Sequence, residues 1–229
     1  MELDANTVRG ASRWLLAIDT STEQAGIALY DGTHILEYSW PGGRQQTVSV
    51  LPAIERLLDD ARITLAEIGA VAVATGPGSF TGLRVGLSMA KGLAIDGERA
   101  VIGVPTLDVT AAPHRMFGIP VVALVPAGRG RVVWAAYPTH GGASPVTNSS
   151  FDEFVATLEA HRYSAVVGEL SPQQRARIDS IGVRVASPAL SVRRPAVLAE
   201  IAYLRWQLGD VDEPTTLEPL YVHGQPNPR

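Results

Sequence analysis

The sequence predicts an α/β fold in two successive halves, each with a mixed sheet flanked by helices. In the first half, three predicted strands follow one another directly, and helices then alternate with strands. The second half repeats this order more loosely, from a hairpin through a helix to further strands. At 229 residues and 46% hydrophobic content, the chain is long enough for one large core or two smaller ones.

Three antiparallel strands are expected at the start of the first half. Residues 14–18 form a short apolar run that leads into the polar turn 19–22, as a buried strand does. Residues 25–30 and 33–40 then flank Asp31-Gly32, a dipeptide that suits the two positive φ angles of a type I′ turn. Together these segments predict a meander.

Helical signals follow the hairpin. Apolar residues at helical spacing predict an amphipathic helix over roughly Gln46 to Ala61, with Pro52 in its first turn or at a kink. Thr64 and Glu67 have the spacing of a capping box, which predicts a short helix. Residues 70–74 are typical of a buried strand that leads into the next turn.

The run from Thr75 to Ala94, TGPGSFTGLRVGLSMAKGLA, joins a glycine-rich turn to a helix with a stripe of small side chains. We call this stripe the helix seam; it consists of Gly82, Gly86, Ala90 and Ala94. Glycine inside a helix costs about 0.5–1 kcal/mol relative to alanine, so the seam requires a compensating close contact. Packing against the chain's own sheet is at least as well supported as packing against another molecule. In the first case Phe80, Arg84 and Ser88, on the opposite side, are free to meet a partner.

The remaining elements are expected in a regular order. A strand at 101–104 and a helix from Pro105 toward Ala112 close the first half. The second half then contains a hairpin, a helix, two short strands and a last helix. Their expected positions are 121–125 with 131–137, Ser150 to Ala160, 165–168, 183–186 and Pro195 to Leu208.

We expect four regions along the chain: a loose tail over 1–12, a first lobe over 13–110, a smaller second lobe over 111–224, and a second tail over 225–229. The first twelve residues lack the basic end and apolar core of a leader. No apolar run approaches the roughly 18 residues that span a membrane.

Charge and composition argue against several classes of function. The formal net charge of −4 gives no overall attraction to phosphate backbones, so autonomous binding of RNA or DNA is not expected. The absence of cysteine excludes a disulfide framework, a zinc thiolate site and a thiol nucleophile, and it permits a cytosolic location. Charged residues make up 18% of the chain, below the usual quarter, which indicates that part of the surface is covered.

Asp19, Thr20 and Ser21 lie where actin-like and sugar-kinase-like ATPases place their first phosphate loop, between two strands. Such loops use glycine so that backbone N–H groups can approach a phosphate, but side chains occupy that space here. Gly76 and Gly78 precede a helix whose N-terminus could hold an anion, but the lysine of a Walker loop is absent and an intervening proline removes a donor. We interpret these five residues as a vestigial phosphate loop, in which Asp19 satisfies nearby backbone donors.

No metal site or hydrolase site is evident in the sequence. The histidines show no i, i+4 pair and no carboxylate at ligand spacing; they are His34, His114, His140, His161 and His223. No G-x-S-x-G elbow is present to support a serine hydrolase. Two small basic groups, Arg129 with Arg131 and Arg193 with Arg194, are typical of solvated faces, with contact to tRNA inside an assembly as the lesser alternative.

Four segments together resemble the TsaB (YeaZ) family of bacterial tRNA threonylcarbamoyladenosine biosynthesis proteins. They are LLAIDTST, LPAIERLL, ATGPGSFTGLRVGLSMAKGLA and VIGVPTLDVTA, and they lie within residues 14–112. The segment PLYV near Leu220 resembles the closing segment of the family. The resemblance implies an actin-like (ASKHA, ribonuclease H-like) two-lobe fold.

The resemblance also implies a non-catalytic scaffold or activator subunit. It would pair with the catalytic paralogue TsaD, which holds the metal and transfers a threonylcarbamoyl group to the adenosine next to the anticodon of tRNAs that read codons beginning with A. The ATPase TsaE would complete the assembly, tRNA would be met only within the complex, and a homodimer would form when TsaD is absent. The H-x-x-x-H metal motif of TsaD has no counterpart here, and no cofactor or membrane contact is expected of this cytoplasmic chain.

In the family, the two helices after the hairpin form a bundle with the equivalent pair of the partner. Carried onto matching positions, the partner interface would draw on Gln46, Ser49, Val50, Ala53, Leu57, Phe80, Arg84, Val85 and Ser88. Two departures stand out: family members commonly have histidine at the position of Gln46, and an acid and an arginine at the positions of Pro126 and Gly128. The second departure argues against contact with nucleotide or product through the second hairpin.

An enzyme is the alternative from another class. A stand-alone actin-like ATPase or small-molecule kinase could act through Asp19 and the glycine turn, but the first loop lacks glycine and no second acidic loop is evident. A metallopeptidase of the same fold superfamily would lack its metal ligands.

Overall fold

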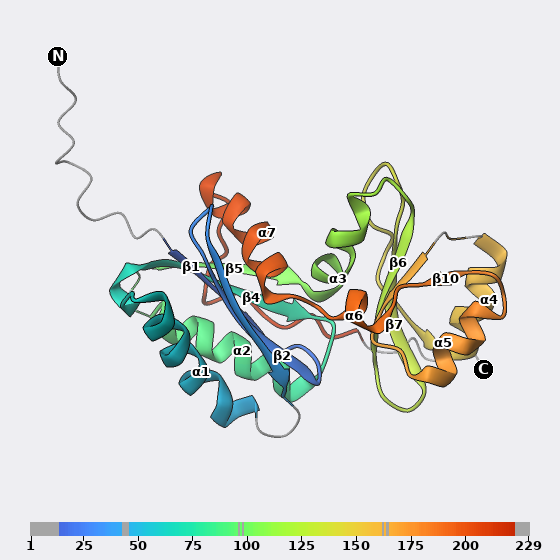
Figure 1. The fold of residues 1–229 in the computed structure, drawn as a ribbon, viewed down its shortest axis with the longest axis horizontal. Helices are drawn as coiled ribbons and strands as arrows, with labels where there is room; N and C mark the ends of the chain where they lie inside the picture. Colours follow the sequence, from blue (N-terminus) through green and yellow to red (C-terminus); the bar gives the residue numbers. More distant parts are fainter. Residues whose placement is uncertain are drawn as a thin grey trace, which may run out of the picture.

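The computed structural model describes residues 14–42, 46–95, 97, 99–161, 163 and 165–222, and their strands form two five-stranded sheets (Figure 1). The two expected tails, 1–12 and 225–229, and His223 lie outside the described residues. Residue 222 is the last residue described.

The first sheet has the strand order β3-β2-β1-β4-β5. Its strands are β1 (Trp14–Asp19), β2 (Gln24–Tyr30), β3 (Ile35–Pro41), β4 (Ile68–Gly76) and β5 (Ala100–Pro105). The first three are antiparallel neighbours, while β4 pairs parallel with both β1 and β5. The predicted meander, followed by parallel strands, is confirmed. All nine residues of β4 are buried, which explains its continuous apolar run.

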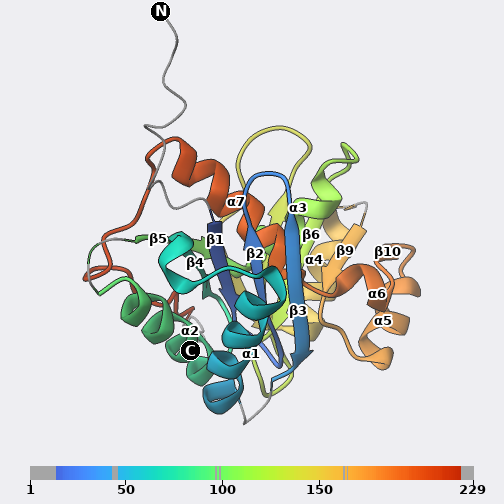
Figure 2. The ribbon, with the colours of Figure 1, turned by 60° about the vertical axis from the view of Figure 1, so that its left-hand side comes forward.

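Helices cover both faces of the first sheet. In Figure 1, α1 (Gln46–Ala61) and α2 (Phe80–Leu93) lie below it, and α7 (Pro195–Gln207) lies above it. Figure 2 shows α1 and α2 side by side in front of the strands. The short 3₁₀ helix η2 (Leu65–Glu67) begins as predicted, because the carboxylate of Glu67 accepts a hydrogen bond from the backbone N–H of Thr64 at 2.8 Å.

The second sheet repeats the topology of the first, with the order β10-β9-β6-β7-β8. Its strands are β6 (Val121–Pro126), β7 (Arg131–Tyr137), β8 (Thr147–Ser150), β9 (Ala165–Gly168) and β10 (Arg184–Val185). Again three antiparallel strands are followed by two parallel ones, so the expected looser echo is a true structural repeat. Its helices are α4 (Phe151–His161), α5 (Pro172–Asp179) and α6 (Pro188–Ser191). The elements β8, α5 and α6 were not predicted, because they are short or only weakly periodic.

Two helices cross the division expected between residues 110 and 111. The helix α3 (Thr106–Arg115) packs Val109 into the core of the first sheet, but Leu107 and Ala111 into the core of the second. The last helix, α7, packs Leu198, Ala199 and Ala202 against the first sheet. The boundary is therefore corrected: the first lobe consists of β1–β5 with α1, α2 and α7, the second consists of β6–β10 with α4–α6, and α3 lies between them. An apolar helix face predicts burial, but not which sheet it will cover.

The helix seam faces the first sheet. A Cβ atom added at Gly86 would lie 2.5 Å from Thr20 Oγ1 and 3.3 Å from Val73, and the other seam residues, Gly82, Ala90 and Ala94, are buried as well. The hydroxyl of Thr20 donates a hydrogen bond of 2.7 Å to the backbone oxygen of Gly82. The small side chains of the seam thus allow α2 to lie close on its own lobe, which leaves the opposite side of α2 outward.

Candidate functional site

The two halves of the vestigial phosphate loop are packed against each other. After β1, the carboxylate of Asp19 accepts hydrogen bonds from Ser21 N at 2.9 Å and Ser21 Oγ at 2.6 Å, which makes the turn a closed structural motif. The backbone N–H of Ser79 donates to Ser21 O at 2.6 Å, and a Cβ atom at Gly78 would lie 2.0 Å from the same oxygen. Protein backbone therefore fills the space next to this loop.

Gly76 has a separate reason for being glycine. Its φ is +112°, and an added Cβ would meet Leu220 O at 2.8 Å. Leu220 in turn donates its backbone N–H to Thr75 O at 2.7 Å. The segment that follows α7 thus crosses the glycine turn closely, and this contact accounts for Gly76 without any bound anion.

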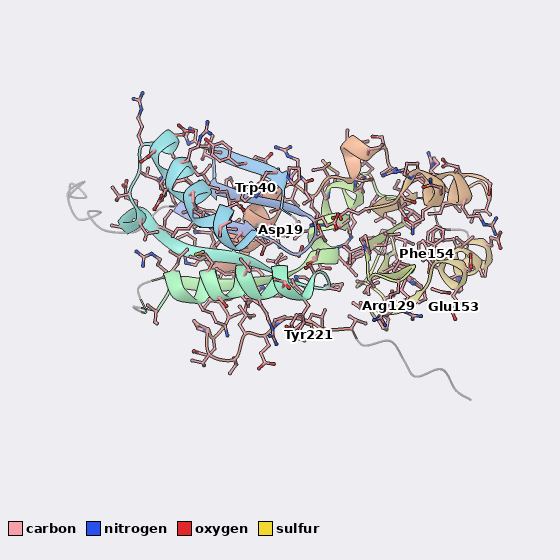
Figure 3. The ribbon with its side chains drawn as sticks, turned by 90° about the horizontal axis from the view of Figure 1, so that it is seen from below. Asp19, Trp40, Arg129, Glu153, Phe154 and Tyr221 are labelled. Atoms are coloured by element: carbon pink, nitrogen blue, oxygen red, sulfur yellow. The ribbon has the colours of Figure 1, made fainter. Side chains whose placement is uncertain are left out.

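Arg193, expected on a solvated face, is instead buried at the junction of the two lobes, so that expectation is wrong. Its Nε donates to Asp19 Oδ2 at 2.8 Å, Nη1 to Glu169 Oε1 at 2.8 Å and Nη2 to Thr22 Oγ1 at 2.7 Å. Burial by itself would lower the pKa of Arg193, but the charges of Asp19 and Glu169 outweigh it and raise the pKa. Figure 3 shows Asp19 near this junction.

The other arginines of the two basic groups differ among themselves. Arg194 has a side chain 63% exposed and pairs with Glu37, Nε to Oε1, at 2.7 Å. Arg131 is half-buried and donates from Nε to Asn148 Oδ1 at 2.8 Å, so it also departs from a solvated face. Arg129 is exposed, as expected.

The expected partner interface divides into buried and exposed residues. Val50 and Leu57 are fully buried in the core of the first lobe, so they cannot meet a partner in this fold. They belong to the apolar stripe by which α1 packs on its sheet, and helical spacing alone does not give the exact facing of a neighbouring position. Of the others, Phe80, Arg84 and Ser88 are exposed, while Ser49, Ala53 and Val85 are half-buried. The side chain of Gln46 lies outside the described residues, although its backbone begins α1.

Two exposed apolar residues of α1 were missed. Val48 is 70% exposed and Leu51 is 47% exposed, and both lie on the helix surface that Val50 does not reach. Val48 lies outside the spacing that predicts the buried stripe, so the sequence could have indicated its exposure. Leu51 has the spacing of the stripe relative to Ile54 and is exposed nevertheless, which only the structure shows.

The outward side of α2 carries an apolar groove of about 610 Å³. Its lining residues all come from α2: Phe80, Thr81, Arg84, Val85, Ser88, Met89, Gly92 and Leu93. Gly92 opens onto this groove, and an added Cβ there would meet nothing within 4 Å. The groove therefore gives one helix an exposed, mostly apolar surface, which in monomeric proteins is often functional.

Tyr221 closes the N-terminal end of this groove. Its ring lies 5.3 Å from that of Phe80, centroid to centroid, and its hydroxyl accepts a hydrogen bond of 3.1 Å from Arg84 Nε. The guanidinium of Arg84 also lies 4.0 Å from the centroid of Phe80. Figure 3 shows Tyr221 beside the first turn of α2. Only the PLYV segment pointed to this region in the sequence, and nothing in its spacing indicated contact with α2.

The chain resembles known proteins in both sequence and structure. Residues 41–186 match the family model described as TsaD: tRNA N6-adenosine threonylcarbamoyltransferase. The tRNA threonylcarbamoyladenosine biosynthesis proteins TsaB of Escherichia coli K12 and Bacillus subtilis 168 are 38% and 36% identical, over 125 and 129 residues. The solved structure of YeaZ from Pseudomonas aeruginosa has a TM-score of 0.73 at 26% identity, and the match covers 91% of this chain and 99% of that one. The chain belongs to the TsaB (YeaZ) family.

The sequence matches to TsaB cover a smaller part of the chain than the structural match to YeaZ does. The aligned region covers 54% of this chain and 54% of the Escherichia coli protein, so the chain spans about half the length of the curated relatives it matches. An uncharacterized protein of Mycobacterium tuberculosis H37Rv is 31% identical over 212 residues, which cover 91% of this chain and 90% of that protein.

Pro126 and Gly128, where a departure from the family pattern was expected from the sequence, line a cavity of about 690 Å³ between the lobes, together with Phe80 and Tyr221. Within the described residues, no group of histidine and carboxylate side chains could hold a metal ion. Among the helices of those same residues, none has the length and apolarity to cross a bilayer.

Proposed function

We propose that this chain is a non-catalytic subunit in the biosynthesis of tRNA threonylcarbamoyladenosine, and that it pairs with the catalytic paralogue TsaD through the outward face of α2. One contrast carries the proposal. Backbone fills the vestigial phosphate loop, since Ser79 N bonds to Ser21 O at 2.6 Å, whereas the apolar groove on α2 is open to an incoming helix.

The exposed residues of the groove have the composition of an interface centre. Aromatic and arginine side chains provide most of the binding energy in protein interfaces, and Phe80, Arg84 and Tyr221 form such a cluster at one end of α2. Val48 and Leu51 of α1 add exposed apolar surface on the same side of the sheet. A second helix pair laid against α1 and α2 would bury both sets of side chains.

The proposal includes further partners. TsaE would join the pair as the ATPase, tRNA would be met only within the assembly, and a second copy of the chain would cover the groove when TsaD is absent. The transferred threonylcarbamoyl group would go to the adenosine next to the anticodon, in the cytoplasm. The chain itself would contribute position rather than chemistry.

Size-exclusion chromatography with the cognate TsaD tests the pairing. At micromolar concentrations we expect one peak of the combined mass, and the tRNA modification reconstituted with TsaD and TsaE should depend on this chain. Two separate peaks, together with full modification in the absence of the chain, would contradict the proposal.

We expect the substitution Arg84→Glu to weaken pairing with TsaD by about tenfold or more, which is about 1.4 kcal/mol. The change reverses a charge at the centre of the Phe80 and Tyr221 cluster, yet Arg84 is exposed and the fold should not depend on it. Isothermal titration calorimetry gives the affinity, and circular dichroism checks the fold. Arg177→Glu, the same change on the exposed surface of α5 in the second lobe, is the matched control and should bind as the parent chain does.

A further inference from the structure

A buried ion cluster joins the two lobes at a position that the proposed pairing with TsaD does not use. Asp19 belongs to the first lobe and is the last residue of β1, and Glu169 belongs to the second lobe and directly follows β9. Arg193 lies in the segment between α6 and α7, and its side chain is 1% exposed. The guanidinium therefore lies between carboxylates of the two different lobes.

Hydrogen bonds link the members of the cluster to one another. All three guanidinium nitrogens of Arg193 donate, to Asp19, to Glu169 and to the hydroxyl of Thr22, at 2.7–2.8 Å. The Thr22 hydroxyl donates to Glu169 Oε1 at 2.6 Å, and the second oxygen of Asp19 accepts from Ser21. A buried charge is tolerated when it is paired and hydrogen-bonded in this way.

We infer that Asp19 and Glu169 form a cation site shared by the two lobes, and that its resident cation is the chain's own Arg193. Two carboxylates brought to one junction repel each other unless a cation lies between them. A planar guanidinium suits such a site better than a point charge, because its fork can donate to both carboxylates and to a hydroxyl at once.

Because the cation is a side chain of the protein, the two lobes are held together at all times. A metal or a metal-bound phosphate enters and leaves a junction, so it can couple ligand binding to lobe movement. A side chain of the same polypeptide is present in every molecule. The two lobes are therefore held in one arrangement without any bound ligand. The outward face of α2 then keeps a fixed position and orientation relative to the second lobe.

Chemical rescue tests the identity of the site. Arg193→Ala should lower the midpoint of thermal unfolding by about 6–20 °C, because a buried pair that loses one partner is strongly destabilised. Millimolar methylguanidinium should raise that midpoint again, while sodium chloride of equal ionic strength should not. The matched control is Arg194→Ala, which removes an exposed arginine that pairs with Glu37; it should change the midpoint little and should show no rescue.

A folded Arg193→Ala chain with an unchanged midpoint, or one that methylguanidinium leaves unaffected, would overturn the inference. If Arg193→Ala does not fold, Glu169→Gln provides the second variant, because it keeps the shape of a side chain that is 28% exposed and removes only its charge. Its midpoint should fall below that of Glu159→Gln, an exposed control on α4. Equal midpoints for these two variants would also overturn the inference.

The distance between the lobes gives a second readout. The chain contains no cysteine, so spin labels can be attached at Asp59→Cys on α1 and Glu159→Cys on α4 alone. Electron–electron double resonance should give one narrow distance distribution that magnesium ATP does not shift, and Arg193→Ala or Glu169→Gln should broaden it. A distribution that magnesium ATP shifts in the parent chain would contradict a resident cation. These experiments contain no TsaD, so their failure is distinct from a failure of pairing.

Discussion

Replacing Phe80 with alanine should weaken pairing with TsaD by about 30-fold or more, which corresponds to about 2 kcal/mol at the centre of an interface. The side chain is 54% exposed in the isolated chain, its ring packs at a tilt against that of Tyr221, and the guanidinium of Arg84 lies over it. Truncation would therefore remove the aromatic anchor of the cluster and leave Arg84 without its platform. The affinity is measured by isothermal titration calorimetry with purified TsaD.

Phe117→Ala is the matched control for this prediction. Phe117 is 71% exposed and follows α3, and Figure 1 places that helix on the side of the molecule away from α2. Its removal should leave the affinity for TsaD unchanged. Equal loss of affinity in both variants would show a general effect on the fold, and no loss in either would exclude Phe80 from the interface.

Gly78→Ala should destabilise the fold by about 3 kcal/mol, because its Cβ atom would lie 2.0 Å from the backbone oxygen of Ser21. Neither the turn after β1 nor the glycine turn can give way cheaply: Ser21 is held by Asp19, and Ser79 is bonded to the same backbone oxygen. Urea unfolding followed by circular dichroism measures the loss as a lower midpoint with an unchanged slope.

Gly92→Ala, the same substitution at an open position of α2, should stabilise the fold instead of destabilising it. No atom lies within 4 Å of its added Cβ, so the gain in helix propensity should stabilise the chain by about 0.5–1 kcal/mol. Should Gly78→Ala prove as stable as the parent chain, the two loops would not be packed as described, and the argument that backbone fills the phosphate position would fail.

The comparison between sequence and structure shows which features are local. The capping box of Thr64 with Glu67 is confirmed and the hairpin between β2 and β3 forms, since each depends on residues within a few positions of one another. The predicted type I′ turn is wrong: Tyr30 pairs with Ile35 across the loop 31–34, in which Gly32 has a positive φ and Asp31 does not. The seam of α2 packs on its own sheet. The exposure of Phe80 and Arg84 also follows from the seam, because the bare side of a helix packs inward and the opposite side is left outward.

Features that the sequence analysis missed depend on distant residues. Arg193 and Asp19 are 174 positions apart, and Arg84 and Tyr221 are 137 apart. Nothing in the spacing around either residue indicates its partner. The same holds for α3 and α7, whose apolar faces were evident although the sheets they cover were not, and for Val50, whose burial was decided by how α1 turns on its sheet.

The sequence by itself determined the order of the longer elements and the α/β class, because hydrophobic period, caps and turn residues act over a few bonds. Tertiary structure decided which lobe each helix stabilises, which side chains remain outside for a partner, and which cation lies between Asp19 and Glu169. The physical reason is that burial and charge pairing are set by atoms that meet only when the chain has folded.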